Sequence, residues 1–236
     1  MAHAVKANQI EPWRRRLYVP IYRVGESARY AGTSTQTAVR WHMSDNSSVL
    51  SQRANGACFS YLQLIELAVV AAMRREGVKL RAIRAAREYF SKTLNSEFPF
   101  AEYRFKTDGS NLIVDYQQVD PSVGLGTLLY PNKGGQLGWK EILDRRLKEF
   151  FYEDNGIVIR WRVGGDHSSV FIDPRVSFGA PAVSGAATWA IKGRWEAGES
   201  VGDIACDFAL TQDQVLEALK FEGVQPDIYR QNLWAS

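Results

Sequence analysis

The stretch Ile21–His42, IYRVGESARYAGTSTQTAVRWH, predicts two short helices joined by a tight turn. Residues 24–31 place apolar side chains at helical spacing, which favours a first helix. Gly32 then ends that helix, and Ser34 supplies an oxygen that can cap a second helix over residues 35–42. A helix, a glycine-containing turn and a second helix form a helix-turn-helix.

Two longer helices follow the helix-turn-helix. Ser60 and Gln63 have capping-box spacing, and we expect the helix that they begin to run to about Glu76, where Gly77 ends it. The next helix, over residues 80–92, keeps its apolar positions on one face while its arginines point elsewhere. We expect this pair to form a helical hairpin that packs on the helix-turn-helix.

The pattern changes in the middle of the chain. Tyr103–Thr107 and Asn111–Gln117 read as strands on either side of Asp108-Gly109, which is a hairpin turn signal. Residues 137–151 have helical periodicity, and residues 156–163 alternate like a strand. We expect a small unit that mixes both kinds of structure.

The last part of the chain predicts a second helix-turn-helix. After a loop rich in proline and glycine, three short helices are expected over Thr188–Ala197, Val201–Phe208 and Gln212–Phe221. The last two helices each begin with capping spacing, at Ser200 and at Thr211.

These elements predict an α+β fold that is mostly helical. A frayed basic leader precedes Leu17, and residues 43–57 form either a loop or a small β-wing. We expect a first domain over residues 17–95, a mixed middle unit over 96–170 and a three-helix domain over 171–228.

Composition excludes several classes of protein. The 236 residues hold two cysteines, too few and too far apart for a disulfide framework. The longest apolar run, LQLIELAVVAAM, is interrupted by Glu66 and is too short to span a membrane. The first residues lack the apolar core of a secretory signal. We therefore expect a cytoplasmic protein with no membrane association.

The charge is divided unevenly along the chain. Residues 1–95 hold 15 Lys/Arg and 6 Asp/Glu, a balance of +9, whereas residues 96–236 hold 14 and 20, a balance of −6. A basic front half and an acidic back half favour two surfaces with different partners. Chance variation of charge along the chain is the simpler alternative.

Catalytic motifs find little support. The three histidines have no metal-ligand spacing, and Gly164–His167 reads as a turn rather than as part of a triad. Residues 131–135, PNKGG, lack the order of a phosphate-binding loop. The scattered acids Asp108, Asp115 and Asp120 leave open a Mg²⁺-dependent nuclease, but such carboxylates are usually solvated. We expect no enzyme and no cofactor.

Nucleic-acid binding is better supported. The candidate recognition helix, residues 35–42, contains no acid, and its short or forked polar groups suit phosphate clamping and base readout in a major groove. Flanking arginines can neutralise phosphates. An ordinary helical bundle with a solvated polar face is the alternative. The residues expected to bind DNA are Arg23, Arg29, Ser34, Gln36, Thr37, Arg40 and Arg53.

The second helix-turn-helix has the opposite charge. From residue 171 to residue 227 the chain holds 4 basic and 9 acidic residues, a balance of −5, which disfavours contact with phosphates. Such a face suits a basic protein partner or a dimer contact, with a solvated surface as the simpler alternative. The acids that we expect at a protein contact are Asp203, Asp207, Asp213 and Glu217.

Several of these strings resemble known families. The segments RVGESA, TAVRW and GVKLRAIR resemble the winged helix-turn-helix of MerR-like regulators. DPRVSFGAP and WEAGESVGDIACDF resemble the small C-terminal domain of antitoxins. Together, over most of residues 17–225, the chain is similar to the long VapB-type antitoxins, which are encoded beside PIN-domain ribonuclease toxins. The resemblance implies an antitoxin that binds such a toxin and binds operator DNA as a homodimer to repress its operon.

Two departures limit what the resemblance carries over. MerR-like regulators continue into a long dimerisation helix, whereas this chain breaks at Ser96–Pro99. The segment Ser184–Trp189 also lacks the basic residue that is common after the glycine in related C-terminal domains. The competing hypotheses are a stand-alone regulator that senses a small ligand in the middle unit, and an RNA-acting enzyme.

Overall fold

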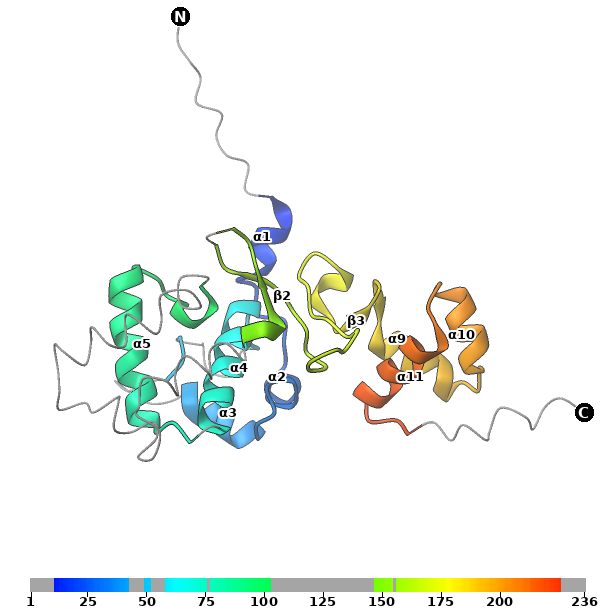
Figure 1. Cartoon of the computed structure of the whole chain (residues 1–236), viewed down its shortest axis with the longest axis horizontal. Helices are drawn as coiled ribbons and strands as arrows, with labels where there is room; N and C mark the ends of the chain where they lie inside the picture. The colour runs from blue at the N-terminus through cyan, green and yellow to red at the C-terminus, as the bar shows by residue number, and fades with distance from the viewer. Residues whose placement is uncertain are drawn as a thin grey trace, which may run out of the picture.

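The structure is a computed structural model, and it describes residues 11–42, 49–51, 58–75, 77–102, 147–154 and 156–225. Figure 1 shows α2 to α5 at one end of the molecule and α9 to α11 at the other, with β1 to β4 between them. The coarse expectation of a mostly helical α+β fold is confirmed for the described residues.

The two helices and the turn predicted over residues 24–42 are present in the structure. The helices are α2 (Val24–Ala31) and α3 (Thr35–His42). Gly32 adopts a left-handed conformation with φ 66°, which lets the chain reverse between the helices at little steric cost. The Ser34 hydroxyl accepts the Thr37 backbone N–H at 3.1 Å and so caps α3.

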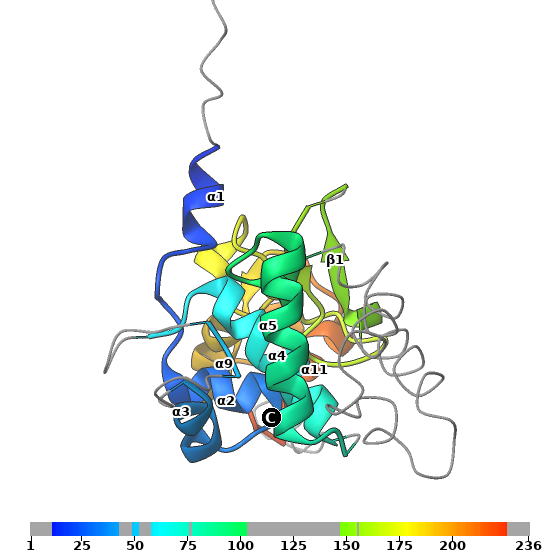
Figure 2. The ribbon, with the colours of Figure 1, turned by 90° about the vertical axis from the view of Figure 1, so that its left-hand side faces the viewer.

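Helix α4 (Tyr61–Arg75) is the central element of the first half, with 13 of its 15 residues buried. Its capping box forms as predicted, since the Ser60 N–H donates to Gln63 and the Gln63 N–H donates to the Ser60 hydroxyl. Figure 2 shows α5 (Leu80–Leu94) lying across the outer side of α4. Because α4 is enclosed by other elements, most of its side chains are apolar on every face.

A single carboxylate interrupts this apolar helix. Glu66 is fully buried, accepts the Ser51 N–H at 3.0 Å and lies 3.6 Å from the Arg87 guanidinium. Burial raises the pKa of Glu66. The nearby Arg87 charge and the hydrogen bond from Ser51 act in the opposite direction but do not cancel this effect.

Within the described part of the chain, no helix is long and apolar enough to cross a membrane.

The chain leaves the helical path after α5, as predicted. Asn95 takes a left-handed conformation with φ 50° and ends α5. A short 3₁₀ turn, η1 (Pro99–Ala101), then places Phe98 and Phe100 in the core. Helix α5 therefore does not continue into a long helix of the kind that MerR-like regulators use for dimerisation.

The middle unit is described only in its second part. The expected strands at 103–107 and 111–117 with their hairpin turn lie outside the described residues, as does most of the expected wing at 43–57. Of the helix expected over 137–151, residues 137–146 lie outside the described residues, and the prediction is wrong for residues 147–151. There, a 3₁₀ turn, η3 (Leu147–Glu149), leads into a strand, β1 (Phe150–Tyr152).

Cross-strand pairing explains the error. Strand β1 pairs antiparallel with β2 (Val158–Trp161), which is the strand predicted within residues 156–163. Phe150 lies opposite Trp161, with ring centroids 5.6 Å apart. Aromatic pairs of this kind stabilise a sheet, and here they override a local helical pattern.

The segment before Leu17 was expected to be frayed, but its described part is ordered. Residues Pro12–Arg16 form a short helix, α1, and Arg14 makes two hydrogen bonds to Glu153, at 2.5 and 2.8 Å. Leu17 itself is buried. A basic side chain therefore fixes this segment to the loop after β1.

The C-terminal helices agree with their predicted ranges to within one residue. They are α9 (Thr188–Glu196), α10 (Val201–Asp207) and α11 (Gln212–Phe221). Ser200 and Thr211 cap the last two helices through the N–H groups of Asp203 and Gln214. A small hairpin of β3 (Ala182–Val183) and β4 (Ala186–Ala187) precedes them.

The described residues form two apolar cores. The first contains side chains from α2 to α5 together with β1 and β2. The second contains side chains of α9 to α11 and of β3, among them Ile204 and Leu219. Val163, which follows β2, packs against both cores and links them.

Candidate functional site

Helix α3 presents a polar face to solvent. Gln36 and Arg40 are exposed, and Thr37 is half-buried. On the opposite side Ala38 and Trp41 are buried. The buried residues fix the helix against the first core, so that the two exposed side chains project away from the protein.

Two residues of this polar face, Ser34 and Thr37, form hydrogen bonds with each other. The Ser34 hydroxyl donates to the Thr37 hydroxyl at 2.8 Å and also accepts the Thr37 N–H. At the other end of α3, the His42 ring is buried, with Nδ1 3.0 Å from the Ser51 carbonyl oxygen. Gln36 and Arg40 thus remain the exposed long polar side chains of α3.

The flanking arginines lie in different places. Arg23 is exposed at the start of α2, where its N–H donates to Glu26 at 3.3 Å. Arg29 donates to the Phe221 carbonyl oxygen at 2.9 Å and lies 3.4 Å from the Glu222 carboxylate. Arg53 lies outside the described residues.

Arg29 therefore joins the two halves of the molecule. Its guanidinium lies over the rings of Tyr30 and Phe221, at 5.0 and 5.1 Å from their centroids. Those two rings stack on one another with centroids 5.9 Å apart. This contact holds the end of α11 against α2.

The four acids that were expected at a protein contact also differ from one another. Asp213 and Asp203 are exposed, although Asp203 accepts the Ser200 hydroxyl at 2.6 Å. Asp207 is exposed and forms an ion pair with Arg194 at 2.6 Å. The acidic face therefore includes pairs formed within the C-terminal half.

Glu217 has a role inside the fold. It accepts hydrogen bonds from the backbone N–H and the hydroxyl of Ser169, so it fixes α11 to the segment just after the Gly164–His167 turn. Burial alone would raise the pKa of Glu217, but hydrogen bonds from Ser168 and Ser169 outweigh it and hold the pKa below its usual value.

Gly164–His167 forms a turn, as the sequence predicts. It follows β2, with His167 exposed and its ring 3.8 Å from the Asp166 carboxylate. Within the described part of the chain, no group of three His, Cys, Asp or Glu side chains is placed to hold a metal ion.

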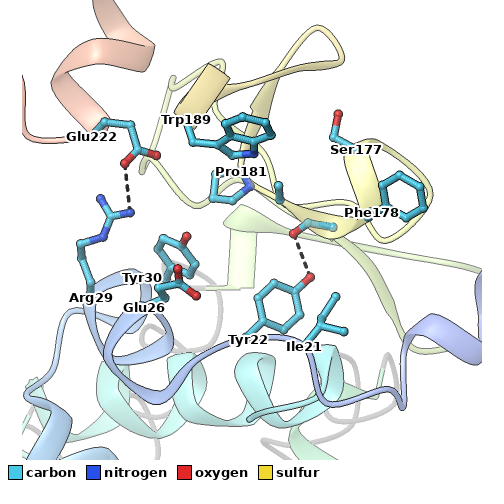
Figure 3. A pocket seen from close by; sticks show the side chains of 12 residues that line it. Ile21, Tyr22, Glu26, Arg29, Tyr30, Ser177, Phe178, Pro181, Trp189 and Glu222 are labelled. Carbon is cyan, nitrogen blue, oxygen red and sulfur yellow. Dashed lines mark hydrogen bonds and ion pairs between the residues drawn. The ribbon is translucent and has the colours of Figure 1, made fainter. Parts of the chain in front are cut away.

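A groove lies between the two halves of the molecule, and the sequence did not predict it. We call it the α2–α9 groove. It has a volume of about 510 Å³. Figure 3 shows one wall from residues 21–30, with Tyr22, Glu26 and Tyr30, and the other wall from residues 177–189.

The second wall carries large apolar side chains that remain in solvent. Phe178 is 76% exposed and Trp189 is 66% exposed, while Ile21 on the first wall is 43% exposed. Apolar side chains gathered in this way on a protein surface commonly mark an interaction site. Arg29 and Glu222 close one end of the groove.

Several hydrogen bonds hold the loop that carries Phe178. Asp173 receives a bidentate pair from Arg175, at 2.6 and 2.9 Å, and the Arg175 N–H at 2.9 Å. These bonds join the aspartate and the arginine of the DPRVSFGAP string. The Ser177 hydroxyl donates to the Gly185 carbonyl oxygen at 2.7 Å.

The backbone of this loop is unusual. Ser177, Phe178 and Gly179 have φ of 45°, 54° and 81°, three left-handed residues in succession. The Tyr22 hydroxyl donates to the Gly179 carbonyl oxygen at 2.9 Å, and burial raises the pKa of Tyr22. A Cβ at Gly179 would lie 2.4 Å from that hydroxyl, so the close approach requires glycine.

Sequence reasoning missed this groove for a definable reason. Aromatic residues such as Phe178 and Trp189 usually predict burial, and no local pattern distinguishes an exposed one. The available signal was the DPRVSFGAP string itself, because adjacent proline, glycine and serine residues allow uncommon backbone conformations.

No model of a known protein family matches this chain. A relative from Mycobacterium tuberculosis, named "Putative antitoxin VapB45", is 26% identical over an alignment of 229 residues, and the match covers 86% of this chain and 94% of the relative. This likeness supports the resemblance to VapB-type antitoxins.

A solved structure has the same fold. The crystal structure of the Mycobacterium tuberculosis protein Rv2018 superposes with a TM-score of 0.70 at 24% identity, and the match covers 86% of this chain and 99% of that one. The arrangement of elements is therefore shared along almost the whole of that protein.

Proposed function

We propose that this chain is the antitoxin of a toxin–antitoxin pair, and that it binds and neutralises a PIN-domain ribonuclease toxin. The observation that carries the proposal is the likeness, over 86% of this chain, to a protein with an antitoxin name. The acidic C-terminal half and the apolar groove beside it offer surfaces for a protein partner. In this role the chain itself is not an enzyme.

Co-expression tests this proposal. The toxin candidate is the product of the gene adjacent to the one that encodes this chain, and its expression alone should arrest growth. We expect co-expression of this chain to restore growth, the two proteins to co-purify, and RNA cleavage by the toxin to stop in the complex. Growth arrest that persists despite equal expression of this chain would refute the antitoxin role.

We further propose that residues 17–95, as a winged helix-turn-helix domain, bind operator DNA as a homodimer and repress the operon. Residues 96–170 and 171–228 would form the middle unit and the toxin-binding domain. The exposed, acid-free face of α3, with Gln36 and Arg40, supports the DNA-binding part. In a major groove these side chains suit base edges and phosphates, and two copies would read half-sites about one helical turn apart.

A mobility-shift assay with the promoter region tests the DNA contact. We expect Arg40→Ala to weaken binding and to lower the slope of affinity against salt by about one unit, because one phosphate contact is lost. Lys92→Ala removes one positive charge from an exposed position on α5, where Lys92 pairs with Glu88, and serves as the control. Equal affinity and slope for Arg40→Ala and the unchanged chain would exclude α3 from the contact.

A further inference from the structure

The α2–α9 groove has features of a built binding surface. Two exposed aromatic side chains, Phe178 and Trp189, stand on one wall. Three consecutive left-handed residues hold Phe178 in place, and such backbone conformations cost free energy unless surrounding contacts maintain them. Here the Tyr22–Gly179 and Ser177–Gly185 hydrogen bonds maintain them.

The charge in the groove selects the kind of partner. Glu26 is exposed on the first wall, between Tyr22 and Tyr30, and Trp189 faces this wall across the groove. A carboxylate beside aromatic rings attracts a cation, both by charge and by the cation–π interaction. Arg29, the basic residue of the lining, is paired with Glu222, which leaves the charge of Glu26 unbalanced in the groove.

These features disfavour the other occupants. A nucleic acid would bring phosphates towards Glu26 and the acids of the C-terminal half. A second copy bound by a two-fold axis would place the same patch against itself, which brings Glu26 towards its own equivalent. A basic protein segment meets neither objection.

We infer that the α2–α9 groove is the docking site for the toxin, and that it receives an apolar side chain of the toxin next to a lysine or arginine. This inference rests on the proposed antitoxin function and specifies which surface binds the toxin. The apolar side chain packs between Ile21 and Phe178, and the cation lies beside Glu26 and Trp189.

Binding of the full-length chain to the purified toxin, measured by calorimetry, tests the surface. We expect Phe178→Ala and Trp189→Ala each to weaken binding at least about tenfold, as exposed aromatic anchors commonly do. Phe151→Ala is the matched control, since Phe151 is a 38% exposed aromatic residue on β1 that does not line the groove. Both groove residues are mostly exposed, so their variants should fold normally, which circular dichroism checks.

A second variant isolates the charge. Glu26→Gln keeps a side-chain oxygen that can accept the Arg23 N–H, so the start of α2 remains capped. We expect Glu26→Gln to weaken toxin binding several-fold and to reduce its dependence on salt. Unchanged affinity and salt dependence would overturn the cationic part of the inference.

The outcomes separate the inference from the function on which it rests. If the unchanged chain does not bind the toxin, the antitoxin function fails and the docking site fails with it. If the unchanged chain binds and both aromatic variants bind within about twofold of it, only the docking site is overturned. If those variants instead turn a dimer into a monomer, measured by light scattering, while toxin binding persists, the groove is an interface between copies.

Discussion

Glu217 illustrates at the residue scale how the fold uses a side chain that sequence alone assigned to a partner. A carboxyl whose pKa is lowered by folding adds stability above the pKa of the unfolded chain, and this contribution is lost as pH falls through the folded pKa. Hydrogen bonds from Ser168 and Ser169 lower the pKa of Glu217 in this way. The ionised side chain therefore stabilises the contact of α11 with Ser168 and Ser169.

We expect Glu217→Gln to lower the free energy of unfolding near neutral pH, and this deficit to shrink as pH falls below about 4.5, the usual value for a glutamate. Urea unfolding at a series of pH values measures it. Asp213→Asn, at an exposed position of the same helix, is the control and should change little. A deficit that stays constant with pH would show that ionisation of Glu217 is not its source.

The roles of single residues could be predicted only where local spacing determines them. Ser34, Ser200 and Thr211 cap helices as expected, because a cap acts on a backbone N–H three residues away. Arg29 was predicted as a phosphate contact, yet it contacts Phe221 and Glu222, nearly two hundred residues along the chain. Contacts of that range depend on the packing of whole elements.

At the scale of elements, helices were predicted well and the strands less so. The ranges of α2 and α3 were predicted to the residue, because glycine, serine and threonine mark their ends. The aromatic run of β1 was predicted as helix, since its strand conformation depends on pairing with β2. The hairpin of β3 and β4 was not predicted, and each of its strands has two residues.

The cap of α11 gives a prediction for an element. Thr211 and Gln214 form a reciprocal capping box, with hydrogen bonds of 2.9 and 3.2 Å. We expect Thr211→Ala to lower the free energy of unfolding by about 1 kcal/mol, the usual cost of a lost cap. Thr211→Ser keeps the hydroxyl and should retain most of the stability in the same urea titration. Similar losses in both variants would show that the hydroxyl is not what matters.

At the scale of the whole molecule, the two apolar cores predict two regions that open separately in local unfolding. Ile204 is buried in the second core and Ile83 in the first. Replacing a buried isoleucine by alanine usually costs about 2–5 kcal/mol. We expect Ile204→Ala to speed hydrogen exchange in α9 to α11 far more than in α4, and Ile83→Ala to do the reverse.

Hydrogen exchange read by mass spectrometry separates these regions. Equal acceleration throughout the chain in both variants would show that the two cores unfold as one unit.

The uneven division of charge suggested two surfaces, but no sequence pattern indicated how the two halves of the molecule pack against each other. That arrangement depends on a few contacts between distant residues, such as the bond from Tyr22 to Gly179.

The position of α2 has a thermodynamic consequence. This helix precedes the proposed DNA-reading helix and also lines the α2–α9 groove. If a toxin in the groove shifts α2 and so changes operator affinity by some factor, reciprocity requires operator DNA to change toxin affinity by the same factor. Occupancy of the promoter would then vary with the supply of toxin, and no separate sensor would be needed.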